Sequence, residues 1–272
     1  MNHHQPASTV VFVTGASSGI GKSTAKYLSQ LGYVVYGTSR RPGSYPQPEH
    51  FTMLEMDVRN EMSVKETVRY IVEKEGKIDV LVNNAGYGIG GAIEDTSPKM
   101  VEEQMNTNFF GIFRVLHYVL PVMKKQEHGL IINMSSIGGV IGLPYQGIYS
   151  ASKFAVEGLT EALYKELFTR NIKVVMVEPG DFKTGFTANR EIITKEGKAD
   201  IFEKSREVIE HDEQSGQPPI KIAYLIEKIM NKKHPRLRYS IGAFDQKLSI
   251  LLKKILPDRW FDLIIMKYYK VK

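Results

Sequence analysis

The sequence predicts an α/β fold, a doubly wound parallel sheet of about seven strands with helices on both faces. Short apolar runs rich in Val and Ile alternate along the chain with longer segments of helical period. The short runs are almost continuously apolar, as expected for parallel strands that are covered on both faces. Strands that alternate with helices in this way predict crossover units, and ligands then bind at the carboxyl ends of the strands.

Each expected element is a run that fits one of these two patterns. Strands are expected at Val10–Thr14, Tyr33–Thr38, Thr52–Met56, Ile78–Val82, Leu130–Met134, Lys173–Val177 and Arg238–Ile241. The clearest helices are expected at Lys22–Leu31, Ser63–Lys74, Val101–Lys124 and Ser150–Arg170. Three prolines within Arg41–His50 obstruct both helix and strand, so this stretch is a predicted loop.

Length and composition predict one domain over residues 1–272 with its own core. The chain is 42% hydrophobic and 24% charged, which is ordinary for a globular protein. It has no cysteine, which excludes disulfides, thiolate metal sites and cysteine nucleophiles and suits a reducing cytoplasm. Its seven histidines lack ligand spacing, so no metal site is expected. Neither a signal-peptide pattern nor a run of about 18 apolar residues is found, and we expect a cytoplasmic protein.

The net charge of +6 is concentrated at the C-terminus. Residues 247–272 hold seven basic and two acidic side chains, a balance of +5, so the rest of the chain is nearly neutral. A basic groove-reading helix with exposed aromatic residues is not recognisable either. We therefore expect no nucleic-acid partner.

The glycine-rich stretch TGASSGIG (Thr14–Gly21) follows the first expected strand and precedes a helix. Glycines allow a tight turn and a close approach to a pyrophosphate, whose charge the helix N-terminus favours. A turn without any ligand could have the same glycines. Three residues separate the first two glycines, as in the short-chain dehydrogenase/reductase family, which this sequence resembles. The resemblance implies a Rossmann-like fold, a nicotinamide cofactor and the interconversion of an alcohol and its carbonyl.

The resemblance also implies cofactor contacts at the ends of later strands. Asp57 follows the third strand, NNAGYG (Asn83–Gly88) the fourth, and EPGDFKT (Glu178–Thr184) the sixth, although each could be an ordinary turn. The expected cofactor-binding residues are Gly15, Ser17, Ser18, Gly19, Ile20, Gly21, Ser39, Arg40, Asp57, Val58, Asn84, Ala85, Gly86, Tyr149, Lys153, Pro179, Gly180 and Thr184.

The end of the second strand bears on the choice between the two nicotinamide cofactors. An acidic residue there would bind the ribose hydroxyl of NAD, whereas arginine accommodates the 2′-phosphate of NADP. The chain has Ser39, Arg40 and Arg41 with no carboxylate, which favours NADP(H). The alternative is that both arginines are solvated loop charges.

The stretch YSASK (Tyr149–Lys153) can supply the proton for a carbonyl reduction. A tyrosine of ordinary pKa about 10 donates near neutral pH only if that pKa is lowered, and three units correspond to roughly 4 kcal/mol. A cation one helical turn away could contribute a similar amount. The same spacing occurs at Tyr70/Lys74, Tyr224/Lys228 and Tyr268/Lys272, but only Tyr149 opens a helix thirteen residues after a strand-ending serine, Ser136.

The family resemblance assigns roles to four residues. It implies that Ser136 orients the substrate oxygen, that Tyr149 transfers the proton, and that Lys153 lowers the tyrosine pKa and binds the ribose. Asn108, in NTNFFG, matches the residue that anchors a proton-relay water. Taken singly, each could be a turn residue, a buried amide or a surface pair.

Two segments are expected to set substrate identity. The loop after Ser136 and a lid over residues 181–219 carry bulky apolar side chains, which favours a hydrophobic alcohol or ketone. The expected substrate-binding residues are Ser136, Val140, Leu143, Tyr145, Tyr149 and Phe186. The sequence looks most like the branch with 17β-hydroxysteroid and retinol dehydrogenases, which implies a steroid, retinoid or long-chain lipid-like substrate. The apolar residues could instead pack the lid itself.

The segment 243–272 forms a C-terminal amphipathic extension that Pro257 should divide into two helices. Basic amphipathic helices can lie on anionic membranes. The alternative is a helix pair that covers the substrate mouth or a subunit interface. Family resemblance suggests a homo-dimer or homo-tetramer.

The sequence therefore predicts an NADP(H)-dependent oxidoreductase of hydrophobic alcohols and carbonyls. A reductase of small ketones or 3-oxoacyl thioesters would share the same catalytic residues. A regulatory protein that senses NADP(H) without chemistry would share the glycine turn but would not need Asn108, Ser136, Tyr149 and Lys153 together.

Overall fold

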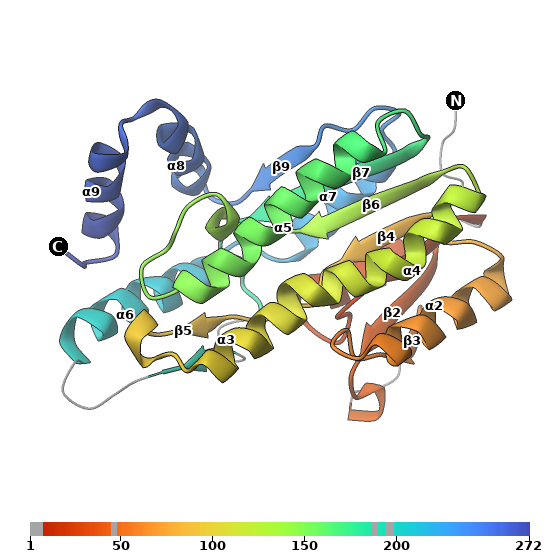
Figure 1. The fold of residues 1–272 in the computed structure, drawn as a ribbon, viewed down its shortest axis with the longest axis horizontal. Coiled ribbons are helices and arrows are strands. Elements are labelled where there is room, and N and C mark those ends of the chain that lie inside the picture. Colours follow the sequence, from red (N-terminus) through yellow and green to blue (C-terminus); the bar gives the residue numbers. More distant parts are fainter. Residues whose placement is uncertain (1–7, 45–47, 186–189, 194–198) are drawn as a thin grey trace.

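The computed structural model describes residues 8–44, 48–185, 190–193 and 199–272 (Figure 1). Seven strands form one parallel sheet in the order β3-β2-β1-β4-β6-β7-β9, which confirms the predicted fold class. Its strands are β1 (Val10–Val13), β2 (Val34–Ser39), β3 (Thr52–Glu55), β4 (Val80–Asn83), β6 (Gly129–Met134), β7 (Ile172–Pro179) and β9 (Arg238–Ile241). Each coincides with an expected strand to within a few residues. The strand order reverses between β1 and β4, where a doubly wound sheet binds its ligand.

Helices cover both faces of this sheet (Figure 1). They are α1 (Gly19–Gln30), α2 (Glu61–Glu75), α3 (Pro98–Met105), α4 (Gly111–Lys125), α5 (Gly147–Glu166), α6 (Ala199–Ser215), α7 (Ile220–Met230), α8 (Phe244–Ile255) and α9 (Asp258–Tyr268). A second, two-stranded sheet pairs β5 (Ile89–Gly90) with β8 (Glu191–Ile192). The sequence did not predict it, because two-residue strands have no readable period.

The alternation of side chains along the strands produces a core on each face. Val10 and Phe12 of β1 pack with α2, α4 and α5, whereas Val11 and Val13 pack with α1 and α7. All four side chains are fully or almost fully buried. Burial on both faces explains why the strands read as continuous apolar runs.

The helix expected at Val101–Lys124 is interrupted. The chain passes from α3 through a π-helical turn, Asn106–Phe110, into α4. A π-turn adds one residue to a helical turn and often lies at a functional site. Here it carries Asn108.

The C-terminal extension forms two helices, as the position of Pro257 indicated. Pro257 lies between α8 and α9, which together form a hairpin beyond the carboxyl ends of β7 and β9 (Figure 1). The end of α9 contacts α6, because Tyr268 donates a hydrogen bond to Asp212 at 2.7 Å. Among the described residues, none of the helices is both long and apolar enough to cross a membrane.

Candidate active site

One continuous cavity of about 610 Å³ lies at the carboxyl edge of the sheet. It runs from the glycine turn between β1 and α1, past Tyr149 and Lys153, to the inner sides of α6, α8 and α9. All the predicted cofactor-binding residues line it except Gly21. The elements that the sequence placed far apart therefore meet at one cavity.

The glycine turn has the conformation that a phosphate site needs. Gly15 and Gly19 have φ values of +68° and +53°, which glycine adopts without strain. A Cβ on Gly21 would collide with the carbonyl of Gly15, so this third glycine packs beneath the turn. Within the described chain, the N-terminus of α1 has neither a side-chain cap nor an acidic first-turn residue. Its amides are thus available to an anion.

Asn84, from NNAGYG, holds this turn rather than acting as a simple glycine-turn residue. Its side-chain amide donates to the carbonyls of Thr14 and Gly15, both at 3.0 Å. The hydroxyl of Thr14 in turn accepts the backbone N–H groups of Asn84 and Ala85 at 2.9 and 3.0 Å. These bonds fix the first strand end to the fourth strand end, where the strand order reverses.

We call the part of the cavity between the glycine turn and the end of β2 the cofactor half, because most of the predicted cofactor-binding residues line it, and the rest the substrate half. The cofactor half carries two arginines at the end of the cavity beyond the glycine turn. Ser39 and Arg40 line the cavity, whereas Arg41 does not, and both arginines are exposed. Arg59, which the sequence did not single out, also lines it and forms a bidentate ion pair with Asp57 at 2.7 Å. Burial would raise the pKa of Asp57, but the hydrogen bonds from Arg59 and the charge of Arg40 hold it below its ordinary value.

Tyr149 and Ser136 lie together in the middle of the cavity. Ser136 ends the loop from β6 and caps a short 3-10 turn by accepting the N–H of Gly138 at 3.0 Å. Burial raises the pKa of Tyr149 to about 12, while the hydrogen bond with Ser136 and the charge of Arg190 lower it. From the sequence we expected Lys153 to lower the pKa of Tyr149. In the structure the desolvation of the phenol has the larger effect and raises that pKa.

Lys153 lies one turn after Tyr149 on α5, with its ammonium 5.8 Å from the tyrosine ring centre. The ammonium donates to the carbonyl of Met134 at 2.9 Å. Burial lowers the pKa of Lys153 to about 8, and the neighbouring Glu157 acts in the opposite direction. Lys153 therefore remains mostly charged at neutral pH.

Asn108 is buried behind the cavity wall and contacts α5. Its Oδ1 accepts the N–H of Tyr87 at 3.1 Å, and its Nδ2 donates to the carbonyl of Tyr87 and to Ser152 at 2.9 and 3.0 Å. A Cβ on Gly86 would lie 3.1 Å from Asn108 Oδ1 and 3.8 Å from Lys153 Nζ. The π-turn thus brings Asn108 next to Lys153.

An ion-pair cluster holds α5 on the sheet beside these residues. Arg238 of β9 pairs with Glu178 of β7 at 2.8 Å and with Glu157 and Glu161 of α5. Because Glu157 follows Lys153 by one turn, the cluster fixes the part of α5 that carries Tyr149 and Lys153.

The predicted substrate-binding residues are only partly brought together. Leu143 lines the cavity, but Val140 packs into a small core with Ile137 and Phe261, and Tyr145 packs edge-on against Phe202 with ring centres 5.2 Å apart. Phe186 lies outside the described residues. Val140 and Tyr145 do not line the cavity, and the reason is the same for both: the sequence of a loop does not determine which of its side chains turn inward.

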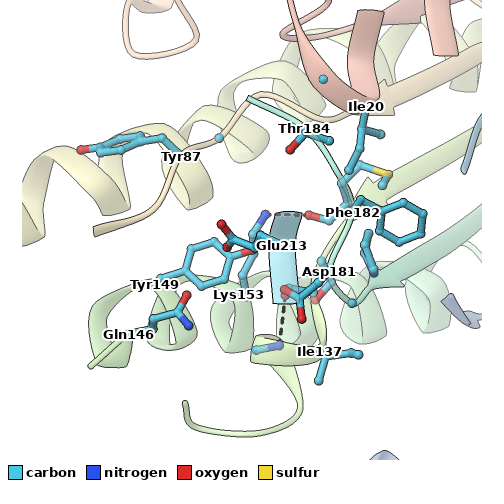
Figure 2. A pocket seen from close by; sticks show the side chains of 18 of the residues that line it. Ile20, Tyr87, Ile137, Gln146, Tyr149, Lys153, Asp181, Phe182, Thr184 and Glu213 are labelled. Carbon is cyan, nitrogen blue, oxygen red and sulfur yellow. Dashed lines mark hydrogen bonds between the residues drawn. The ribbon is translucent and has the colours of Figure 1, made fainter. Parts of the chain in front are cut away.

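The substrate half contains carboxyls that the sequence did not single out. Figure 2 shows Asp181 and Glu213 facing the cavity beside Tyr149 and Lys153. The side chain of Asp181 accepts a hydrogen bond from Gln246 of α8. Burial raises the pKa of Asp181 to about 7, helped by Glu213 and Asp212. Arg190 pairs with Glu213 and lies 3.4 Å from Gln146.

The residues around the turn fit a nicotinamide dinucleotide. The glycine turn and the N-terminus of α1 suit its pyrophosphate, and Arg40 and Arg59 suit an additional phosphate. Thr184 lies against the turn, since a Cβ on Gly19 would be 3.4 Å from its Cβ, and Figure 2 shows it beside Ile20. In the part of the chain that the structure describes, no group of three acidic or histidine side chains could hold a metal ion.

Comparisons with known proteins agree with this geometry. The family model for short chain dehydrogenases matches residues 9–193. A 3-ketodihydrosphingosine reductase from Bacteroides thetaiotaomicron is 47% identical over 267 residues, which covers 97% of this chain and 98% of the relative. Retinol dehydrogenase 8 from Bos taurus is 33% identical, covering 85% of this chain and 81% of the relative.

A solved short-chain dehydrogenase from Streptomyces avermitilis has the same fold. It superimposes with a TM-score of 0.81 at 28% identity and covers 98% of both chains. The matched family region contains the glycine turn, Ser136, Tyr149 and Lys153, which meet at one cavity. This chain is therefore an oxidoreductase of the short-chain dehydrogenase/reductase family, with relatives in its retinol dehydrogenase-like branch.

Proposed function

We propose that this protein reduces the ketone of a long-chain 3-keto amino alcohol, of the 3-ketodihydrosphingosine type, with NADPH. One observation carries the proposal. The cavity that starts at the glycine turn continues past Tyr149 to an acidic cluster and an apolar wall on α8 and α9. A hydride donor, a reacting ketone, an ammonium group and an alkyl chain each find a matching part of this cavity.

In the proposed reaction, the glycine turn and the N-terminus of α1 would hold NADPH, which would supply the hydride for the carbonyl carbon. Ser136 donates a hydrogen bond to the carbonyl oxygen, and Tyr149 gives its phenolic proton to the developing alkoxide. The charged Lys153 stabilises the phenolate that remains and binds the ribose, while Asn108 supports the return of a proton from solvent. Removal of one such proton donor typically lowers the rate by about 10²- to 10⁴-fold.

The phenol of Tyr149 is protonated at neutral pH, chiefly because burial raises its pKa to about 12, with the nearby Glu213 and Asp181 acting in the same direction. The protonated phenol is the form that gives its proton to the alkoxide when a carbonyl is reduced.

The shape and charge of the substrate half support a lipid with a polar head. Asp181, Asp212, Glu213 and Asp245 line the same cavity as Tyr149, and Asp181 and Glu213 lie close enough to raise the pKa of Tyr149. Arg190 pairs with Glu213 at this end. An ammonium group next to the ketone would complement these carboxyls. The apolar wall, which an alkyl chain would contact, comes from α8 and α9 and consists of Leu248, Leu252, Ile264 and Ile265. We propose that α6 and the hairpin act together as the lid.

The proposed preference for NADP(H) rests on Arg40 and Arg59, which both line the cofactor half. A ribose 2′-phosphate between two guanidinium groups would gain charge-assisted hydrogen bonds. The pair Arg59–Asp57 at 2.7 Å holds Arg59 on this side of the cavity.

We also propose a homo-oligomer that packs through α4 and α5, which lie side by side in Figure 1. Three phenylalanine side chains in this region are exposed: Phe110, next to α4, by 46%, Phe113 of α4 by 51%, and Phe154 of α5 by 46%. Exposed aromatic side chains of this size commonly mark a protein interface. Sedimentation velocity of the parent and of Phe113→Glu would test this; an unchanged mass would remove α4 from the interface.

A substrate panel with both cofactors tests the proposed reaction. The panel compares the long-chain 3-keto amino alcohol with its deamino analogue, small polar ketones and 3-oxoacyl thioesters. We expect the amino ketone with NADPH to give the highest kcat/KM. Faster oxidation of NADPH with small ketones or thioesters would overturn the substrate assignment. Binding of NADPH without any turnover would favour a regulatory protein that senses NADP(H).

A further inference from the structure

The C-terminal hairpin has an exposed apolar side as well as a side that faces the cavity. On α8, Phe244, Leu248, Leu251 and Ile255 recur at spacings of four, three and four residues, which places them on one stripe. The exposed apolar side chains of the hairpin are Phe244 (77%), Leu248 (38%), Leu251 (51%), Ile255 (66%), Trp260 (68%), Leu263 (40%), Ile264 (47%) and Tyr268 (43%). We call this set the hairpin rim.

The hairpin rim is continuous with the cavity. Leu248 of α8 and Ile264 and Tyr268 of α9 belong to both, since each lines the cavity and is also exposed. The apolar surface inside the cavity therefore reaches the outside of the molecule along the hairpin. A long alkyl chain that follows this path would contact the side chains of Leu248 and Ile264.

Basic side chains border the hairpin rim. Lys247 and Lys254 follow Phe244 and Leu251 by three residues each, so they flank the exposed stripe of α8. Lys267 follows Trp260 by seven residues and lies on the same side of α9. All three lysines are exposed. An apolar side with a basic border is the pattern of helices that lie in an anionic bilayer interface.

The geometry points to an anionic lipid bilayer as the partner of the hairpin rim, from which a lipid enters the cavity between α8 and α9. The two other roles considered for this segment were a cover over the substrate mouth and a subunit interface. The inner sides of the helices cover the cavity, and five residues of the hairpin rim, Phe244, Leu251, Ile255, Trp260 and Leu263, do not line it. The exposed phenylalanines near α4 and on α5 offer a separate surface for subunit contact. A subunit interface would not need lysines along an apolar stripe, whereas an anionic surface does.

The single tryptophan of the sequence, Trp260, reports on this contact directly. It is 68% exposed on α9 and does not line the cavity. Full-length protein would be mixed with vesicles of phosphatidylcholine or of equimolar phosphatidylcholine and phosphatidylglycerol. We expect a blue shift of the emission and co-sedimentation with the anionic vesicles only. The absence of both, or equal partitioning to neutral vesicles, would overturn the proposal.

Two double variants test the two halves of the surface. Lys247→Gln with Lys254→Gln should weaken partitioning to anionic vesicles about thirtyfold, at about fivefold per lysine. Leu251→Gln with Ile255→Gln should weaken it at least about tenfold, because each change removes an exposed apolar side chain. The control Met62→Gln removes a 56% exposed apolar side chain of α2 and should change nothing.

These measurements contain no substrate, so they remain decisive if the proposed reaction is wrong. None of the four hairpin positions lines the cavity, and turnover of a short water-soluble ketone should equal that of the parent. Partitioning that both double variants retain would overturn the assignment. A fall in oligomer mass in sedimentation velocity, with partitioning unchanged, would make the hairpin rim a subunit interface instead.

Discussion

The substitution Asp181→Asn tests how the cavity recognises its substrate. The change is isosteric, and the asparagine oxygen can still accept from Gln246 as the carboxylate does. It removes a negative charge beside Tyr149 without opening a gap. We therefore expect the variant to fold and to bind NADPH like the parent.

The expected loss follows from the charge that an ammonium group would face. Two unit charges about 4 Å apart interact by roughly 4 kcal/mol at an effective dielectric of about 20, and desolvation offsets part of this. Hydrogen bonds to charged groups contribute about 1.5–3 kcal/mol. The kcat/KM for the long-chain amino ketone should thus fall about ten- to hundredfold, while the deamino analogue should change by less than about threefold.

Steady-state kinetics on both substrates in neutral detergent micelles measures this difference. Because the pKa of Asp181 is about 7, kcat/KM of the parent for the amino ketone should rise as the pH rises through about 7. The variant should lose this rise. Asp262→Asn, an exposed change on α9, is the matched control. An equal loss on both substrates, or none on either, would refute the pairing of Asp181 with an ammonium group.

Four further predictions follow from the same site. Tyr149→Phe should lower turnover at least about 10²-fold while NADPH binding, followed by fluorescence, stays within twofold; retained turnover would refute the proton-transfer role. Arg40→Ala should raise the KM for NADPH about tenfold or more but not that for NADH, whereas Arg41→Ala, outside the cavity, should alter neither. The reduction rate should fall as the pH rises above about 8, because the pKa of Lys153 is about 8 and its charge is lost there; a flat profile to pH 10 would contradict this. Folding raises the pKa of Asp181 from 3.8 to about 7, so the free energy of unfolding of the parent should fall by up to about 4 kcal/mol as the pH rises from about 4 to 7. Asp181→Asn lacks this loss and should melt at a higher temperature than the parent above pH 7. Near pH 4 the two melting temperatures should differ less.

The sequence predicted the scaffold well because its signals are local. The continuous apolar runs marked each strand of the large sheet, and the glycine turn marked the start of α1. Strand ends in a parallel sheet lie along one edge, so residues just after strands, such as Ser136 and Asp57, were expected to line one ligand site. Pro257 marked the division of the C-terminal extension because proline cannot continue a helix.

What the sequence did not predict depends on contacts between distant segments. Asp181 stands in the quoted stretch EPGDFKT, yet its importance appears only when Gln246 and Glu213 are placed around it. Arg59 could have been noticed as a second cation near a strand end. The direction of the pKa of Tyr149 was also unpredictable, since spacing places Lys153 nearby but does not reveal how deeply the phenol is buried.

Gln246 attaches the C-terminal hairpin to the turn after β7. Its side-chain oxygen accepts the N–H of Asp181 at 3.2 Å, and a Cβ on either Gly180 or Gly242 would overlap that oxygen. The turn after β7 and the start of α8 are therefore packed around one side-chain amide. Transfer of this hairpin to another protein of the same fold would preserve that packing only if glycine were present at both positions.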